Sequence, residues 1–206
     1  MMPAKSYSTI FSFVALTTLQ LLLSNSAVAA SGDACGKLPA TGFDRPPNLP
    51  RTGRYVNTEY GYSVAIPAGL NGYVSAEGPE RGFGIVLSWS PRAFIRVDAA
   101  YDAFFDITSQ GVHRSDLTTI RLHDSVVDDQ SATFSLAHKQ GGRYVTRLRC
   151  GTDPQIFIHD QVIVMVNREI YRLELQTVPQ RYDDDVKVIN AMLQSWQWQR
   201  PAARSQ

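Results

Sequence analysis

Short runs of alternating apolar and polar residues, separated by turn-forming residues, dominate the chain from Arg54 onward. Successive side chains of a strand point to opposite faces, so this period of two predicts strands that are buried on one face. The alternating runs occupy residues 55–58, 62–66, 84–89, 93–97, 117–127, 131–138, 143–150 and 171–177, and an apolar run covers 156–166. Because short connections join most of these runs, an antiparallel meander is the simplest topology.

Three of the connections have the composition of turns. Glu59-Tyr60-Gly61 separates the first two runs, and Asn167-Arg168-Glu169 joins the long apolar run to the last one. Gly141-Gly142 is typical of a two-residue hairpin turn, because both central positions of such a turn take positive φ. The sequence therefore predicts a hairpin whose turn is Gly141-Gly142.

Two segments have helical periodicity. Residues 98–109 carry apolar side chains three and four positions apart and acids at 98, 102 and 106, which predicts a short helix. Near the C-terminus, spacings of four, three, four and three separate Tyr182, Val186, Ile189, Leu193 and Trp196. This apolar stripe predicts an amphipathic helix with an acidic first turn, 183–185, that interacts favourably with the helix dipole. The fold class we expect is α+β: an antiparallel β-sheet with flanking helices and a C-terminal amphipathic helix.

The first 29 residues have the three parts of a secretory signal peptide. Lys5 precedes an apolar stretch that ends at Leu23, and Ala27-Val28-Ala29 provides a small-residue cleavage site. The alternative is a retained membrane anchor, but polar residues interrupt a stretch that is shorter than the roughly 20 residues needed to span a bilayer. We expect cleavage after Ala29 or Ala30, a periplasmic or secreted chain, and no stable membrane insertion after cleavage.

The remaining chain divides by composition. Residues 30–53 are rich in glycine and proline and predict an extended leader, residues 54–198 predict a single α+β domain, and residues 199–206 predict a frayed tail. The first thirty residues hold one lysine and no acid, so their removal leaves 19 of the 20 basic side chains against 19 acidic ones. A chain with this balance has no overall field to attract nucleic acid, so we expect no nucleic-acid partner.

The mature chain has two cysteines, Cys35 and Cys150, and therefore one possible disulfide. Disulfides form and persist in oxidising compartments, so export makes a Cys35–Cys150 disulfide the expected state. A reactive or metal-binding thiol is the alternative, but the sequence has no Cys-x-x-Cys spacing to support it. We interpret the pair as a structural link between the leader and the end of a strand.

The two ends of the predicted domain carry a family resemblance. Residues 60–69, YGYSVAIPAG, resemble the opening of the PsbP-like, Mog-type α/β/α sandwich superfamily, and residues 171–175, 181–182 and 193–196 resemble its close. The resemblance spans about residues 54–198, with Leu70 where the family opening commonly has tryptophan. It implies an exported bacterial member with an antiparallel sheet, helices on its faces and a binding or assembly role. No functional residue is transferred, because members bind unrelated partners.

Motifs for common enzyme chemistries are missing from the sequence. There is no G-x-S-x-G, P-loop, H-E-x-x-H or EF-hand pattern, so we expect no catalytic, cofactor-binding or metal-binding residues. The four histidines, at 113, 123, 138 and 159, are scattered singly. Triad residues need not be close in sequence, so a hydrolase with dispersed residues stays open, with His138 and His159 and either Asp153 or Asp160 as first candidates.

One strand predicts a cationic surface. Lys139, Arg143, Arg147 and Arg149 surround a single hairpin, and the three arginines share one face of the strand 143–150. Arginine offers a planar fork of donors, so these side chains form a possible binding ridge for carboxylate or phosphate groups. The alternative is a solvated outer face balanced by acids such as Asp128 or Glu174.

These features favour a non-enzymatic, exported protein that binds a protein partner through its sheet edge or loops. One specific form of this hypothesis is an immunity or inhibitor protein that acts on a periplasmic partner. The alternatives are the hydrolase with dispersed residues and a small-ligand carrier. The sequence does not indicate an oligomeric state.

The disulfide can be tested on the exported chain. We expect no free thiol on alkylation of the unreduced protein and two after reduction. Because the link closes a loop of more than a hundred residues, reduction should lower the free energy of unfolding by up to about 4 to 5 kcal/mol. Two alkylated cysteines in the unreduced protein would contradict the prediction.

Overall fold

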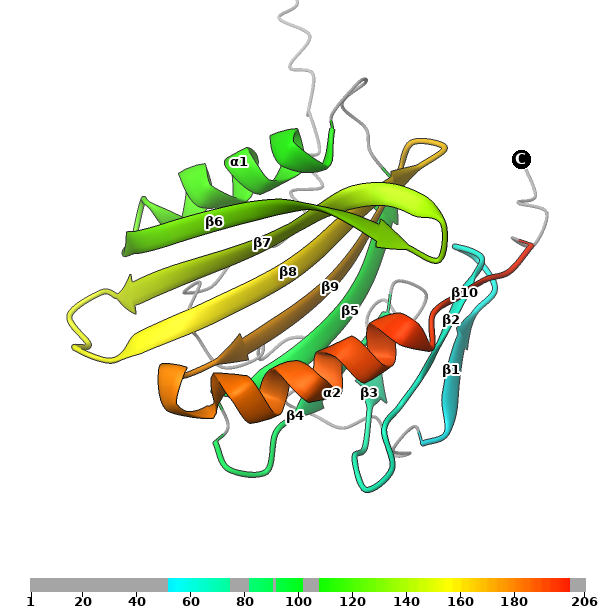
Figure 1. Ribbon diagram of the computed structural model, residues 1–206, viewed down its shortest axis with the longest axis horizontal. Helices are drawn as coiled ribbons and strands as arrows, with labels where there is room; N and C mark the ends of the chain where they lie inside the picture. The colour runs from blue at the N-terminus through cyan, green and yellow to red at the C-terminus, as the bar shows by residue number, and fades with distance from the viewer. Residues whose placement is uncertain (1–51, 75–81, 91, 102–107, 201–206) are drawn as a thin grey trace, which may run out of the picture. The chain divides into compact units, whose positions relative to one another are not determined.

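The computed structural model describes residues 52–74, 82–90, 92–101 and 108–200. Within these residues the chain forms two antiparallel sheets and two α-helices (Figure 1). The larger sheet has the order β3-β4-β5-β9-β8-β7-β6, and the smaller one has the order β1-β2-β10. The strands of the larger sheet are β3 Tyr73–Val74, β4 Gly82–Val86, β5 Phe94–Tyr101, β6 Asp124–Leu136, β7 Lys139–Cys150, β8 Ile156–Val166 and β9 Glu169–Thr177. The smaller sheet consists of β1 Arg54–Asn57, β2 Tyr62–Ala65 and β10 Gln197–Trp198.

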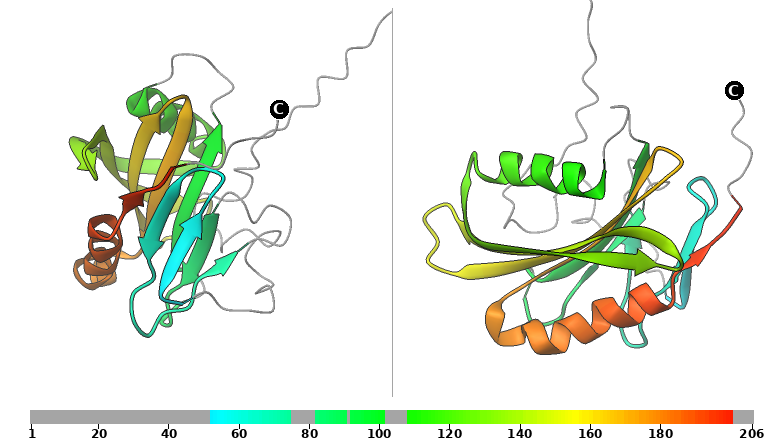
Figure 2. Two further views of the ribbon diagram at one scale, coloured as in Figure 1. Left: turned by 90° about the vertical axis from the view of Figure 1, so that its right-hand side faces the viewer. Right: turned by 45° about the horizontal axis from the view of Figure 1, so that its top comes forward.

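The two helices lie on opposite faces of the larger sheet. Helix α1, Ser109–Ile120, contacts β6, β7 and β8, and helix α2, Tyr182–Gln194, contacts β9 and β2 (Figure 2, right). A single-turn helix, η1, Pro179–Arg181, leads into α2. Because both faces are covered, almost the whole of β8 is buried, which explains why most of its residues are apolar. The expected α+β fold class is confirmed.

The main core lies between the larger sheet, α2 and the smaller sheet. Its least exposed large side chains include Tyr62, Phe83, Ile95, Leu173, Leu175, Ile189 and Met192. The predicted stripe of the C-terminal helix is confirmed, since Ile189, Leu193 and the following Trp196 are buried. Trp196 stacks on Tyr62 with ring centroids 4.7 Å apart and an interplanar angle of 5°, which fixes the end of α2 against β2.

The acidic first turn of α2 has two parts. Asp183 and Asp184 are exposed, and Asp184 accepts a 3.0 Å bond from Lys187. Asp185 is buried and accepts a hydrogen bond from Thr177 at the end of β9. One carboxylate of the triplet therefore joins the helix to the sheet instead of facing solvent.

The predicted Gly141-Gly142 turn is wrong. The turn between β6 and β7 is Ala137-His138, with φ of 43° and 71°, and both glycines lie inside β7, paired with Val164 and Ile163 of β8. A Cβ at Gly141 would come 2.3 Å from the carbonyl oxygen of Ile163, so the glycine permits close approach of two strands. The Asn167-Arg168 turn, with φ of 50° and 68°, joins β8 to β9 as the sequence predicts.

The helix predicted over residues 98–109 is wrong in its described part, and residues 102–107 lie outside the described residues. Asp98 to Tyr101 continue β5 and pair with β9. Ile95, Val97 and Ala99 are buried, so pairing with the sheet overrides the short helical spacing. The first helix begins later, with Thr108 as its N-cap accepting a hydrogen bond from the Gly111 amide.

The strand predicted over residues 117–127 is wrong in its first half. Leu117 belongs to the last turn of α1, and the strand starts at Asp124. The β-branched Thr118 and Thr119 favour the strand prediction, yet their hydroxyls donate to carbonyls one helical turn earlier. Strand β6 also has a bulge between Val126 and Asp128.

The predicted domain boundaries stay predictions, because residues 1–51 and 201–206 lie outside the described part of the chain. Gln199, in the predicted tail, donates its backbone N–H to the carbonyl oxygen of Gly61 at 2.7 Å. No helix in the described residues is long and apolar enough to cross a bilayer.

Candidate functional site

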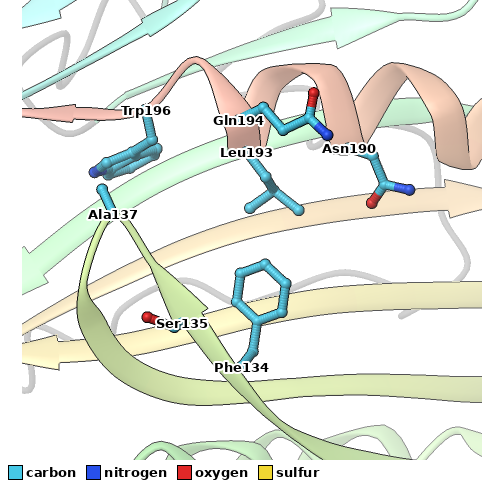
Figure 3. A pocket seen from close by; sticks show the side chains of 7 residues that line it. All are labelled: Phe134, Ser135, Ala137, Asn190, Leu193, Gln194 and Trp196. Carbon is cyan, nitrogen blue, oxygen red and sulfur yellow. The ribbon is translucent and has the colours of Figure 1, made fainter.

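A groove lies between the second half of α2 and the end of the β6–β7 hairpin (Figure 3). Its volume is about 300 Å³, and its lining residues are Phe134, Ser135, Ala137, Asn190, Leu193, Gln194 and Trp196. Asn190 and Leu193 project from α2 toward the sheet, and Phe134 projects from β6 toward the helix. We call this feature the α2 groove.

Helical spacing explains the α2 wall of the groove. Positions three and four apart lie on the same face of a helix, so Asn190, Leu193 and Gln194 line the groove together. Leu193 is buried and Gln194 is exposed, so the wall is apolar at its base and polar at its rim. The chain then leaves the helix and places Trp196 at one end of the groove.

Aromatic contacts hold the hairpin end in place. Trp198 of β10 donates its indole N–H to Ala137 O at 3.1 Å and packs edge-on against Trp196, with ring centroids 5.5 Å apart. The indole nitrogen of Trp196 is buried and has no hydrogen-bond partner in the described structure. The hairpin wall and the tryptophan wall of the α2 groove are therefore bonded to each other across 61 positions of sequence.

A buried ion pair supports the groove from below. Asp160 of β8 is fully buried and accepts hydrogen bonds from Arg143 Nε at 2.8 Å, Arg143 Nη2 at 2.6 Å and the Tyr182 hydroxyl at 2.9 Å. The remaining Arg143 terminal nitrogen donates to Asn190 Oδ1 at 2.9 Å. The pKa of Tyr182 is raised well above its ordinary value by burial and by the Asp160 charge. The ion pair thus orients Asn190, one of the lining side chains.

The predicted cationic ridge is distributed over β7. Arg143 is bonded to Asp160 and Asn190, whereas Lys139, Arg147 and Arg149 are exposed. Arg147 lies opposite Asp128 and Arg149 lies opposite Ser125 in the register with β6. Arg147 and Arg149 are exposed, and their role as binding cations stays a prediction.

The candidate hydrolase residues do not meet in one site. His138 is exposed in the hairpin turn, and Asp153 pairs with Arg92 at 2.6 Å. His159 and Asp160 are neighbours on β8 and so point to opposite faces of the sheet. Of these four residues, none is bonded to another in the described structure, so the arrangement offers no nucleophile and base to the hydrolase alternative.

A histidine, a carboxylate and a hydroxyl do come together under α1. His113 Nε2 lies 3.0 Å from Asp129 Oδ1, and the Thr146 hydroxyl donates to the same oxygen at 2.8 Å. The carboxylate stands between the other two groups, so the hydroxyl has no bond to the imidazole that could activate it. His113 also stacks on Tyr144 with centroids 4.1 Å apart. These contacts fasten α1 to β6 and β7.

The same face of the sheet carries a second set of buried charges. Arg96 of β5 donates to Glu174 of β9 at 2.7 Å, and His159 Nδ1 lies 3.4 Å from the other carboxylate oxygen. Arg172 pairs with Asp116 of α1 at 3.1 Å. Burial by itself raises the pKa of Glu174, but Arg96, His159 and Arg172 together hold it below its usual value. Burial raises the pKa of Asp116.

These clusters carry balanced charges and differ from the α2 groove in kind. The described residues contain no group of three or more histidine, cysteine or acidic side chains placed to hold a metal ion. Of the two cysteines of the predicted disulfide, Cys150 is buried at the end of β7, and Cys35 lies outside the described residues. The disulfide stays a prediction. The α2 groove, whose lining has no ionisable side chain, is the candidate site.

The fold defines a class: an antiparallel α+β protein with a helix on each face of its main sheet. Among solved structures, the chain is similar to cyanobacterial PsbP (CyanoP) from Synechocystis sp. PCC 6803, with 13% identity, a TM-score of 0.49, and 80% of this chain and 97% of that chain covered. PsbP is the family that the sequence ends resemble. No protein-family model and no curated protein matches the chain.

Two other solved structures are similar at lower identity. LpqN, involved in cell envelope biogenesis of Mycobacterium tuberculosis, is 9% identical with a TM-score of 0.47, and 74% of this chain and 92% of that chain are covered. A protein of unknown function and putative regulator from Pseudomonas aeruginosa is 8% identical with a TM-score of 0.39, with coverages of 55% and 74%. These likenesses concern the fold and bring no partner or activity to this chain.

The ion pair below the groove gives a stability prediction. Asp160→Ala leaves the Arg143 guanidinium and the Tyr182 hydroxyl without their buried acceptor, so we expect a loss of about 3 kcal/mol in the free energy of unfolding by urea. Asp153→Ala, which breaks the half-exposed pair with Arg92, is the matched control and should change stability much less. Equal losses in the two variants would contradict the assignment.

Glu174 gives a prediction for acid. Its pKa is lower in the folded chain than in the unfolded chain, so its ionised form stabilises the fold above the unfolded value near 4.5, and this contribution is lost as pH falls through the folded value. Glu174→Gln should destabilise the protein at pH 7 by about 3 kcal/mol and flatten the decline in stability below pH 4.5. The control Asp183→Asn changes an exposed carboxylate, so its free energy of unfolding should depend on pH as in the wild type. If the free energy of Glu174→Gln also ran parallel to the wild-type curve below pH 4.5, the prediction would be refuted.

Proposed function

We propose that this chain is a non-enzymatic, envelope-associated protein that binds a protein partner in the α2 groove. The observation that carries the proposal is the chemistry of the groove lining. Apolar walls from Phe134, Leu193 and Trp196 meet amide groups from Asn190 and Gln194, without an ionisable side chain among the lining residues. Such a surface can bind by burial and hydrogen bonding, and it lacks groups for proton transfer.

The predicted export suggests where the protein acts. A signal peptide over residues 1–29 and a Cys35–Cys150 disulfide would put the folded domain in the periplasm or outside the cell. In its specific form, the proposal is that the chain is an immunity or inhibitor protein that acts on a periplasmic partner. The exposed Arg147 and Arg149 stand one strand from the border of the sheet and supply cations for acidic groups of that partner.

Site-specific crosslinking tests the proposed function. A photo-crosslinking amino acid in place of Gln194, at the rim of the groove, should yield one discrete protein adduct in the native cell envelope. The same amino acid in place of Gln110, exposed on α1 on the opposite face of the sheet, is the control and should not yield that adduct. The adduct band is followed by immunoblotting and its components are identified by mass spectrometry.

Two results would contradict the proposal. One is the same set of adducts from both positions, which would mean random collision. The other is a stoichiometric small molecule in the native mass spectrum together with no protein adduct at Gln194, which would favour the small-ligand carrier.

A further inference from the structure

Strand β6 ends the larger sheet on one side and has no neighbouring strand there among the described residues. A long edge strand offers unpaired amide and carbonyl groups to any other strand, and proteins usually guard such edges with charges, prolines or bulges. In β6 these guards are confined to the first half. Asp124, Asp128, Asp129 and the bulge after Val126 all precede Gln130.

The second half of β6 itself has none of these features. Residues 130–135, QSATFS, contain no charge and no proline, and 130–133 are exposed. Their inner side is paired with β7 in regular register, so the segment is held extended before any partner arrives. Preorganisation of this kind lowers the entropic cost of adding a strand. We call residues 130–135 the open edge.

The open edge borders the α2 groove. Ala132 lies opposite Arg143 in the register, and Arg143 bonds to Asn190 of α2, so Ala132 and Phe134 face the α2 side. Phe134 lines the groove itself. A strand added beside β6 would lie about 4.8 Å away, and every second side chain would point toward the groove.

The groove restricts what that side chain can be. A volume of about 300 Å³ is at the lower limit of pockets that hold drug-sized ligands, and it suits one large side chain. Phe134, Leu193 and Trp196 favour an aromatic or long aliphatic group, and a charged group would be buried there without a counter-charge. The open edge therefore fits a neutral segment with one bulky apolar residue.

Charges at the two ends of the open edge set a direction. Asp128 precedes it on the α2 side, and Lys139 follows the hairpin turn. All pairings of the larger sheet are antiparallel. An antiparallel segment with an acid at its N-terminal end and a base at its C-terminal end would meet the opposite charge at both ends.

From this geometry we infer that β6 accepts an extended segment of the protein partner as an additional strand, with one aromatic or long aliphatic side chain of that segment in the α2 groove. The inference rests on the proposed function and names how the partner binds. Main-chain hydrogen bonds supply the affinity of such a complex, and the groove supplies its specificity.

A designed peptide tests the inference. The probe is acetyl-Glu-Thr-Phe-Thr-Val-Thr-Lys-amide, titrated into the ¹⁵N-labelled exported chain and followed by NMR. We expect shifted and exchange-protected amides in residues 130–135 and a shifted indole resonance of Trp196. Replacing the peptide phenylalanine by alanine, or exchanging its glutamate and lysine, should weaken binding at least tenfold. N-methylation of those alternate peptide amides that would face β6 should abolish binding.

Protein variants provide the matched pair. Thr133→Lys puts a charge on the open edge and should reduce peptide affinity at least tenfold. Val56→Lys puts the same charge on an exposed position of β1, an edge strand of the smaller sheet, and should leave affinity unchanged. Thermal unfolding of both variants verifies that they are folded.

Three outcomes would overturn the inference. The first is that millimolar peptide shifts no resonance of the protein. The second is that the N-methylated peptide binds as well as the unmodified one, because its side chain would then bind without strand pairing. A wild-type dimer in sedimentation that Thr133→Lys dissociates would mean that a second copy covers the open edge. None of these results contradicts the proposed function, which the crosslinking experiment at Gln194 tests separately.

Discussion

Burial of β8 and β9 on both faces is the constraint from which the other features follow. Any polar side chain on a central strand that a helix covers on each side lies in the interior, and each buried charge there needs a partner. Toward α2, Asp160 is satisfied by Arg143 and Tyr182. Toward α1, Glu174 is satisfied by Arg96. These ion pairs connect neighbouring elements, so the partners that the buried charges require also help to fix where α2 and β5 lie on the sheet.

The constraint separates two kinds of polar cluster. Groups that look chemically active, such as His113 with Asp129 and Thr146, are engaged in fastening α1 to the sheet. The groove beside α2 has the opposite character, since its lining residues are neutral. The buried titratable residues thus hold the helices and strands together, and the lining of the α2 groove carries no ionisable side chain.

Sequence periodicity predicted the elements that bury a regular stripe. The C-terminal helix and the strands β7 and β9 repeat their apolar positions for several turns or pairs, so the period decides their structure, and β8 was predicted from its apolar run. Helix α1 was missed because only Val112, His113 and Leu117 of its residues are buried. The hairpin turn was misplaced because Gly141-Gly142 satisfies turn chemistry, whereas close approach to β8 is a tertiary requirement. The groove could not be predicted from the sequence, because the segments that line it are far apart in the chain and only folding brings them together.

The bond between Trp198 and Ala137 has a kinetic consequence. It joins residues 61 positions apart, and strands β7, β8 and β9 lie between them in the chain. Closing so long a loop is slow compared with forming a single hairpin. The two walls of the α2 groove therefore meet through a long-range contact, which forms more slowly than the local β6–β7 hairpin.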